Sequence, residues 1–109
     1  MDDALSDSLR QNIETLDRLL YKDAMVRKRI LTLPGGLCCC LFFCDGMVNG
    51  QLVNLSVVRP LLTCAPVRRR DALAQIENTI QAAEVQRVSD FSALLYALLY
   101  GDTVLLCED

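Results

Sequence analysis

The chain has 109 residues, of which 52% are apolar and 23% are charged, and its formal net charge is −3. This length fits one domain, and the apolar content excludes an intrinsically disordered chain. The negative balance gives no general attraction to nucleic acid or to anionic lipid, so nucleic acid is not expected as a partner. We therefore expect residues 1–109 to form a single domain.

The sequence has neither the pattern of a membrane span nor that of a secretory signal. The unbroken apolar run from Leu37 to Cys44 is far shorter than the roughly 18 residues that a spanning helix needs. Asp2 and Asp3 follow Met1, where a signal peptide would carry basic residues and then an apolar stretch. We expect the chain to begin in the cytoplasm and to remain soluble.

The first expected element is a helix. Apolar residues recur every three or four positions from Leu5 to Leu20, which predicts an amphipathic helix over residues 4–21. Acidic side chains are favoured near the positive end of a helix dipole, and three stand near this start: Asp2, Asp3 and Asp7.

A β-hairpin is expected next. Basic and apolar positions alternate weakly over residues 26–33, and Pro34-Gly35-Gly36 predicts a turn into a second strand at residues 37–44. Every residue of this second strand is apolar. We therefore expect a central strand that helices cover on both faces.

Two helices follow the hairpin. Asn49 is a suitable N-cap for a helix over residues 50–62, which Pro60 should bend or end in its last turn. This helix carries an apolar stripe that consists of Leu52, Leu55, Val58 and Leu62. A further helix should begin at Arg70 or Asp71, run to about Ala82, and bury Leu73, Ile76 and Ile80.

The last third of the chain predicts a strand, a helix and a strand. A short strand is expected over residues 84–88 and a helix over residues 91–99, with Ser89 or Asp90 as the helix cap. Gly101 should end this helix, and residues 103–107 should form the final strand.

Together these elements predict an α/β fold: a small open mixed sheet of about four strands with helices packed on it. The hairpin supplies an antiparallel pair. The helix between the last two strands predicts a parallel βαβ unit with a right-handed crossover.

The six cysteines are expected to be reduced core residues. Most stand in or beside apolar segments, where free cysteine behaves as a small apolar side chain. A metal or redox site and a disulfide are the alternatives, and convergence of Cys38, Cys40, Cys64 and Cys107 would favour a metal site. The chain has no histidine, so the commonest companion ligand for zinc and the usual base for a cysteine nucleophile are both missing.

The remaining polar motifs have simple structural interpretations. Arg68-Arg69-Arg70 precedes a helix start and could bind an anion, but we expect these residues to form a solvent-exposed connecting segment. Asp45 and Asp102 flank glycines at strand boundaries, where turn and capping roles explain them without acid–base catalysis. Ser56 and Ser92 have no histidine to activate them, so a hydrolase triad of the usual form is excluded. Tyr21, Tyr96 and Tyr100 are expected in core or interface packing.

Three segments resemble the soluble N-terminal region of spore germination receptor A subunits, the GerA-type family with its stage V sporulation relative. The first is Phe42-Phe43-Cys44-Asp45-Gly46-Met47-Val48-Asn49, which resembles the end of an apolar strand in that family. The second is Val57-Val58-Arg59-Pro60-Leu61, and the third is Leu98-Leu99-Tyr100-Gly101-Asp102-Thr103-Val104-Leu105-Leu106. A looser match is Tyr21-Lys22-Asp23. The chain departs from the family where cysteines replace aliphatic residues and where Asn49 replaces the common aspartate.

This resemblance implies a non-enzymatic role without a cofactor. The chain would be the first N-terminal subdomain of a longer membrane protein, or else a truncated relative. Its partners would be the remainder of its own A subunit and the B and C subunits, on the cytoplasmic side of the inner spore membrane. A homo-oligomer is a further possibility that the resemblance leaves open.

For this domain we expect an assembly or signal-coupling function carried by apolar surface. The expected surface residues lie at the start of the second helix and along the last one: Met47, Leu52, Leu55, Phe91, Tyr96 and Tyr100. One alternative is a small-ligand-binding α/β module with its site near Asp45-Gly46, at the end of a strand. The other is a cysteine-based metal or redox protein.

Overall fold

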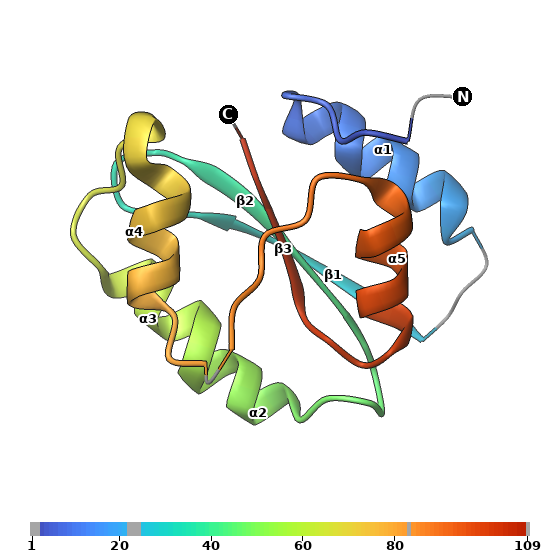
Figure 1. Ribbon diagram of the computed structural model, residues 1–109. Coiled ribbons are helices and arrows are strands. Elements are labelled where there is room, and N and C mark those ends of the chain that lie inside the picture. The colour runs from blue at the N-terminus through green and yellow to red at the C-terminus, as the bar shows by residue number, and fades with distance from the viewer. Residues whose placement is uncertain (1–2, 22–24, 83, 109) are drawn as a thin grey trace.

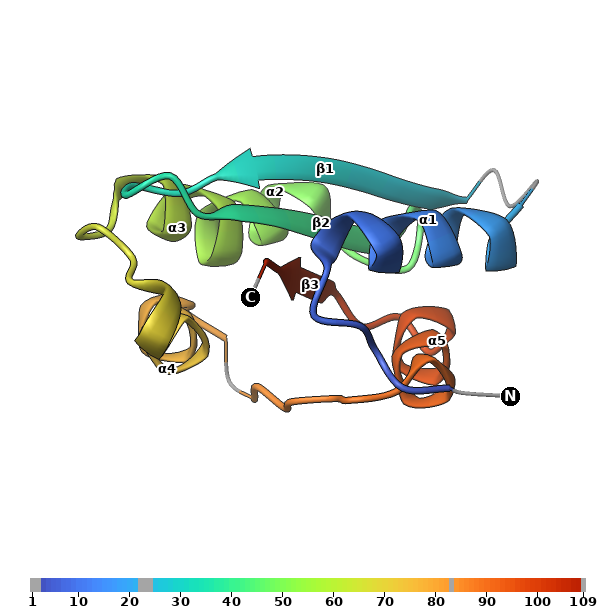
Figure 2. The same cartoon turned by 90° about the horizontal axis from the view of Figure 1, so that it is seen from above.

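The computed structural model describes residues 3–21, 25–82 and 84–108. Lys22 and Asp23 of the Tyr21-Lys22-Asp23 match, and Asp2 of the acidic N-terminus, lie outside these residues. In the described part three strands form an antiparallel sheet in the order β1-β2-β3. Helices α1 and α5 pack on one face, and α2, α3 and α4 pack on the other, as Figures 1 and 2 show.

The hairpin forms as the sequence predicts. Strand β1 (Val26–Thr32) pairs antiparallel with β2 (Cys38–Cys44), with Val26 opposite Cys44 and Thr32 opposite Cys38. β2 is the central strand, and both of its faces are buried. Cys39 and Leu41 point into the core beneath α2, α3 and α4, whereas Cys40, Phe42 and Cys44 point into the core beneath α1 and α5.

The predicted strand at residues 84–88 and the parallel βαβ unit are wrong. Residues 84–88 form no strand and are exposed, and β3 (Val104–Cys107) pairs antiparallel with β2. The apolar strand β3, whose Val104 and Leu106 are buried, therefore occupies the free edge of β2, and residues 84–88 form coil. The sheet has three strands where about four were expected, and its described strands are all antiparallel.

Helix α1 (Leu9–Leu19) starts later than predicted because Ser8 caps it. The Ser8 hydroxyl accepts a hydrogen bond from the Gln11 N–H, which satisfies one of the free donors of the first turn. The residues before Ser8 instead lie against the start of α5, where Leu5 N–H donates to Ser89 O at 2.9 Å and Phe91 N–H donates to Asp3 O at 2.8 Å.

The second predicted helix is one helical segment over residues 50–63. It comprises α2 (Gly50–Val53), the π-helical turn η1 (Asn54–Val58) and α3 (Arg59–Thr63). Pro60 does not end this segment, and the Ser56 carbonyl, which proline cannot serve, still accepts a hydrogen bond. In an α-helix the Pro60 nitrogen would donate to Ser56 O, and here the Gln81 N–H donates to that oxygen at 2.9 Å. This bond fixes the coil after α4 against the helix.

The buried face of this segment differs from the predicted stripe. Val57, Val58 and Leu61 are buried, and of the predicted stripe only Val58 is. Leu52 and Leu55 face outward and are 59% and 54% exposed, and Leu62 is 39% exposed. The segment is apolar on two sides, so periodicity alone could not decide which side packs on the sheet.

The last two helices match the sequence closely. The turn η2 (Arg69–Asp71) leads into α4 (Ala72–Thr79), which buries Ala72 and Ile76. Leu73 was expected to be buried but is exposed, and Ile80 is only partly buried. Helix α5 (Phe91–Leu99) has the predicted bounds and is capped by Asp90, whose carboxylate accepts from Ala93 N–H at 2.7 Å.

Candidate functional site

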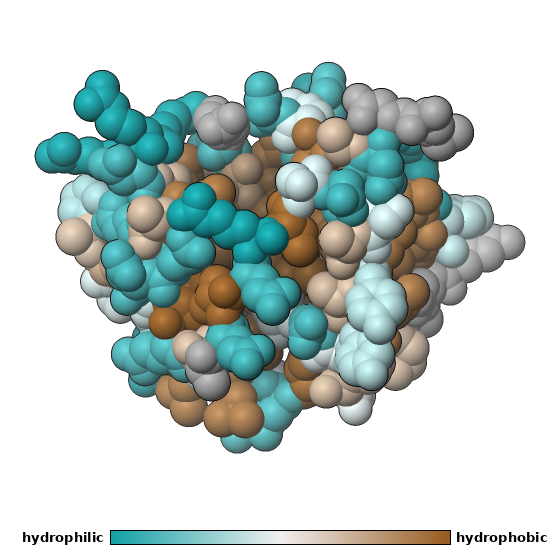
Figure 3. Space-filling model, in the orientation of Figure 1, coloured by the Kyte–Doolittle hydropathy of each residue, from teal (hydrophilic) through white to brown (hydrophobic). Residues whose placement is uncertain are grey.

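Apolar side chains remain exposed where the chain turns from β2 into α2. Asn49 caps α2 as predicted: its Oδ1 accepts from Gln51 N–H at 2.9 Å and from Leu52 N–H at 3.3 Å. The cap fixes the direction of the helix. Met47, which precedes the helix, and Leu52 and Leu55 remain exposed. Figure 3 shows apolar surface over α2 at the bottom of the view.

A second exposed group lies on α5. The rings of Tyr96 and Tyr100 are one helical turn apart and stack with their centroids at 5.4 Å and an interplanar angle of 27°. Both side chains are exposed, as is that of Leu99 between them. Phe91, which the sequence placed in the same surface, is only 7% exposed and packs in the core with Leu94 and Leu98.

The two exposed groups meet at Gly101. This residue has a φ of +103°, and a Cβ added to it would lie 3.3 Å from Met47 Cε. Met47 therefore packs against the turn that follows Tyr100. We call the exposed side chains of Met47, Leu52, Leu55, Tyr96 and Tyr100 the apolar surface, since Met47 links the helix start to the end of α5.

The cysteines divide between the two faces of the sheet. Cys40 and Cys44 lie in the core beneath α1 and α5, with Cys38 packed beside them, whereas Cys39, Cys64 and Cys107 lie on the other face. Cys38, Cys40, Cys64 and Cys107 thus do not converge on one point. Among the described residues, no three of the Cys, Asp and Glu side chains are placed to hold a metal ion.

One pair of thiols is close. Cys39 and Cys107 are partners across β2 and β3, with their Sγ atoms 3.3 Å apart. The hydrogen bond with Cys107, followed by burial, raises the pKa of the Cys39 thiol above its ordinary value. The same bond lowers the pKa of Cys107, because the Cys107 sulfur accepts this hydrogen bond from the Cys39 thiol. The sequence did not indicate this pair, because the register of β2 on β3 could not be read from it.

The polar motifs take mainly structural roles. Arg68, Arg69 and Arg70 are exposed, and Arg69 forms an ion pair with Glu108 at 3.3 Å. Glu108 also accepts from Cys38 N–H at 2.7 Å, so it joins the end of β3 to the start of β2. Asp45 pairs with Arg27 of β1 at 3.1 Å.

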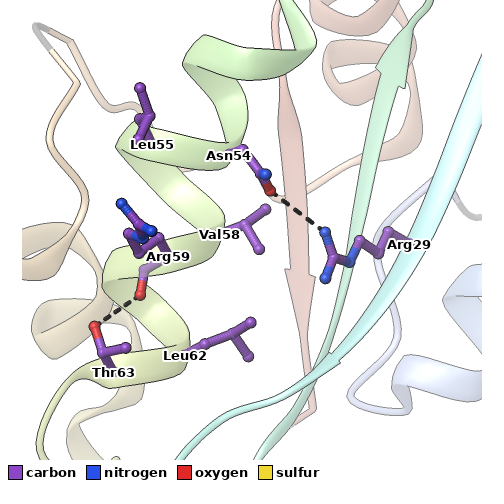
Figure 4. A pocket seen from close by; sticks show the side chains of 7 residues that line it. All are labelled: Arg29, Asn54, Leu55, Val58, Arg59, Leu62 and Thr63. Atoms are coloured by element: carbon purple, nitrogen blue, oxygen red, sulfur yellow. Dashed lines mark hydrogen bonds between the residues drawn. The ribbon is translucent and has the colours of Figure 1, made fainter.

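A groove that the sequence did not indicate lies between β1 and the helical segment 50–63. It consists of two adjoining hollows, one of about 340 Å³ and one of about 420 Å³, which share Arg29, Asn54 and Val58 in their walls. Figure 4 shows Arg29 reaching from β1 to Asn54, while Val58 and Leu62 point from the helix toward the sheet. The larger hollow extends to Asp45. We call these hollows together the β1 groove.

The structure thus defines a small α/β domain with exposed apolar and basic surfaces. No helix of the described residues is long and apolar enough to cross a membrane. Residues 8–109 match the family model described as Bacillus/Clostridium GerA spore germination protein. The chain therefore belongs to the GerA spore germination family.

A solved structure has the same fold. It is the crystal structure of the N-terminal domain of the A subunit of the Bacillus megaterium spore germinant receptor GerK3, with a TM-score of 0.65 and 16% sequence identity. The alignment covers 96% of this chain and 87% of that one. Among curated proteins, no sequence matched this chain.

Proposed function

We propose that the chain is the N-terminal domain of a germinant receptor A subunit and acts there as a non-enzymatic assembly or signal-coupling domain. The observation that carries this proposal is the apolar surface, in which Met47, just before α2, packs at Gly101, the residue that follows Tyr100 of the stacked tyrosine pair. Contiguous exposed apolar side chains are typical of protein contact sites. Tyrosine is enriched in such sites because it buries much area with few rotatable bonds.

The proposed partners are the remainder of the same A subunit and the B and C subunits, with the domain on the cytoplasmic side of the inner spore membrane. Family membership supports this assignment. The non-enzymatic role is supported by the chemistry of the chain: it has no histidine, and Asp45 is engaged with Arg27 in an exposed ion pair. No cofactor is part of the proposal.

The test uses the full-length A subunit in spores. Leu52→Ser with Leu55→Ser, and separately Tyr96→Ser with Tyr100→Ser, should reduce the amount of A subunit that co-purifies with B and C subunits and should slow nutrient-triggered germination. Truncation of an interface hot spot costs about 2 kcal/mol or more, so association should weaken at least about tenfold. Leu73→Ser is the matched control, because Leu73 is an equally apolar, exposed residue on α4, outside the apolar surface. Normal co-purification and germination in both double variants would refute the proposal.

A small-ligand-binding function is the second candidate. The sequence places such a site near Asp45-Gly46, and the larger hollow of the β1 groove, of about 420 Å³, is lined in part by Asp45 and Gly50. Amino acids, sugars and nucleosides, added singly, should then raise the melting temperature of the chain by mass action. An unchanged melting temperature with every compound at millimolar concentration would remove this candidate.

A further inference from the structure

The outer edge of β1 is an open strand edge. Asp45 N–H donates to Met25 O, and Leu33 N–H donates to Leu37 O, so the odd-numbered residues of this strand form the hydrogen-bonded pairs with β2. In an antiparallel ladder the residues between them direct their N–H and C=O groups away from the partner. Within the described residues no hydrogen bond reaches these outward groups, which belong to Val26, Lys28, Ile30 and Thr32.

The charge of this edge differs from that of the whole chain. Arg27, Lys28 and Arg29 stand in sequence on β1 in a protein whose formal net charge is −3. Arg27 and Lys28 form exposed ion pairs with Asp45 and Asp17, which contribute little stability and can exchange partners. Arg29 forms no ion pair in the part of the chain that the structure describes, and its guanidinium donates a hydrogen bond of 3.4 Å to the neutral Asn54.

The β1 groove lies directly beneath this edge on the α2–α3 face. Arg29 lines both hollows, and Arg59 lines the smaller one together with Val58 and Leu62. On the opposite face of the sheet the Ile30 side chain is 60% exposed. A strand added to β1 would therefore direct every second side chain toward Arg29 and Arg59 in the groove. The side chains between them would lie beside Ile30 on the other face.

From these observations we propose that β1 binds an extended acidic segment of a partner protein by β-strand addition. Outward N–H and C=O groups would supply the main-chain hydrogen bonds of such a complex. Acidic side chains on the groove side would meet Arg29 and Arg59, and apolar side chains on the other side would cover Ile30. A second copy of β1 is disfavoured as the occupant, because pairing would bring two runs of three cations together. This surface is separate from the tyrosines of α5, and the proposal does not depend on the proposed function.

The test is an NMR titration of the ¹⁵N-labelled chain with a capped octapeptide of alternating Glu and Val. Saturable shifts should concentrate at the amides of Val26, Lys28, Ile30 and Thr32, and hydrogen exchange at these amides should slow at least about tenfold. A capped octapeptide of alternating Lys and Val should produce no such change. No saturable shift with the acidic peptide, or equal binding of both peptides, would overturn the proposal.

Variants separate the backbone contribution from that of charge. Ile30→Pro removes an outward N–H while the bonds to β2 remain, and proline is tolerated at such edge positions. It should abolish binding, whereas Ile30→Val should not. If Ile30→Pro does not fold, the test is the slowing of hydrogen exchange at the outward β1 amides of the unsubstituted chain when the acidic peptide is added.

Charge reversal provides the second control. Arg29→Glu and Arg59→Glu should each weaken binding of the acidic peptide about tenfold. Arg10→Glu makes the same change of net charge on α1 and should have little effect. Equal weakening by all three would indicate an unspecific charge effect and overturn the assignment. Shifts of the β1 amides that depend on protein concentration without peptide would assign the edge to a second copy and overturn it as well.

Discussion

Replacement of Asn12 by alanine should lower the free energy of unfolding by about 2 kcal/mol. Asn12 is only 4% exposed and is the one buried polar residue among those the structure describes. Its Oδ1 accepts from Ser6 N–H at 2.8 Å, and its Nδ2 donates to Ser6 O at 2.8 Å. Each such bond contributes about 0.5–1.5 kcal/mol net, so the pair contributes about 1–3 kcal/mol.

The loss should extend beyond α1. The segment held by Asn12 is the one whose Leu5 N–H and Asp3 O bond to Ser89 and Phe91 at the start of α5. Urea unfolding followed by circular dichroism at 222 nm measures the effect, because the chain has no tryptophan. With a slope of about 2 kcal/mol per molar urea, the midpoint should fall by about 1 M.

Glu14→Ala is the matched control on the same helix. Glu14 forms an exposed ion pair with Arg10, which contributes at most about 0.5 kcal/mol. Equal shifts of the midpoint in the two variants, or a shift below about 0.2 M for Asn12→Ala, would refute the reasoning.

Two further predictions concern the cores of the two faces. Leu61→Ala should lower the free energy of unfolding by about 2–5 kcal/mol, since Leu61 is 0% exposed. Leu62 is 39% exposed, so Leu62→Ala should lower it by less than about 1 kcal/mol in the same unfolding assay. Similar losses in the two variants would contradict the buried face assigned to α3. Burial raises the pKa of the Cys40 thiol to about 11, so the folded state favours the neutral thiol. This stability is present below about pH 9, where the thiol of the unfolded chain titrates, and is lost as the pH rises toward about 11. Between pH 8 and pH 11 the free energy of unfolding should therefore fall by roughly 2 kcal/mol less in Cys40→Ala than in the unsubstituted chain. Parallel plots of unfolding free energy against pH would contradict this prediction.

Those parts of the fold that depend on local chemistry could be predicted from the sequence. Asn49 and Asp90 cap the helices that they were expected to cap, and the unbroken apolar run of β2 identified the central strand. The turn at Pro34-Gly35-Gly36 joins β1 and β2 as expected. In each case a short stretch of residues determines the structure without reference to distant parts of the chain.

Features that depend on tertiary competition could not be predicted. The spacing of Leu52, Leu55, Val58 and Leu62 is helical, yet only Val58 of the four is buried. The helix buries Val57 and Leu61 instead, which belong to a second apolar side. Residues 84–88 were expected in the sheet, but the place beside β2 belongs to β3, which is more apolar. Leu52 and Leu55 of that stripe are exposed and belong to the apolar surface.

The apolar surface and the basic edge of β1 should respond differently to salt, which allows their roles to be separated in one protein. Contacts between exposed charges are screened over a Debye length that falls from about 10 Å at 0.1 M salt to about 3 Å at 1 M. Binding at Arg29 and Arg59 should therefore weaken as salt increases. Association through Met47, Leu52 and the stacked tyrosines depends on apolar burial, which sulfate and phosphate salts strengthen. A domain that engages one partner through α5 and another through β1 would release only the second at high salt.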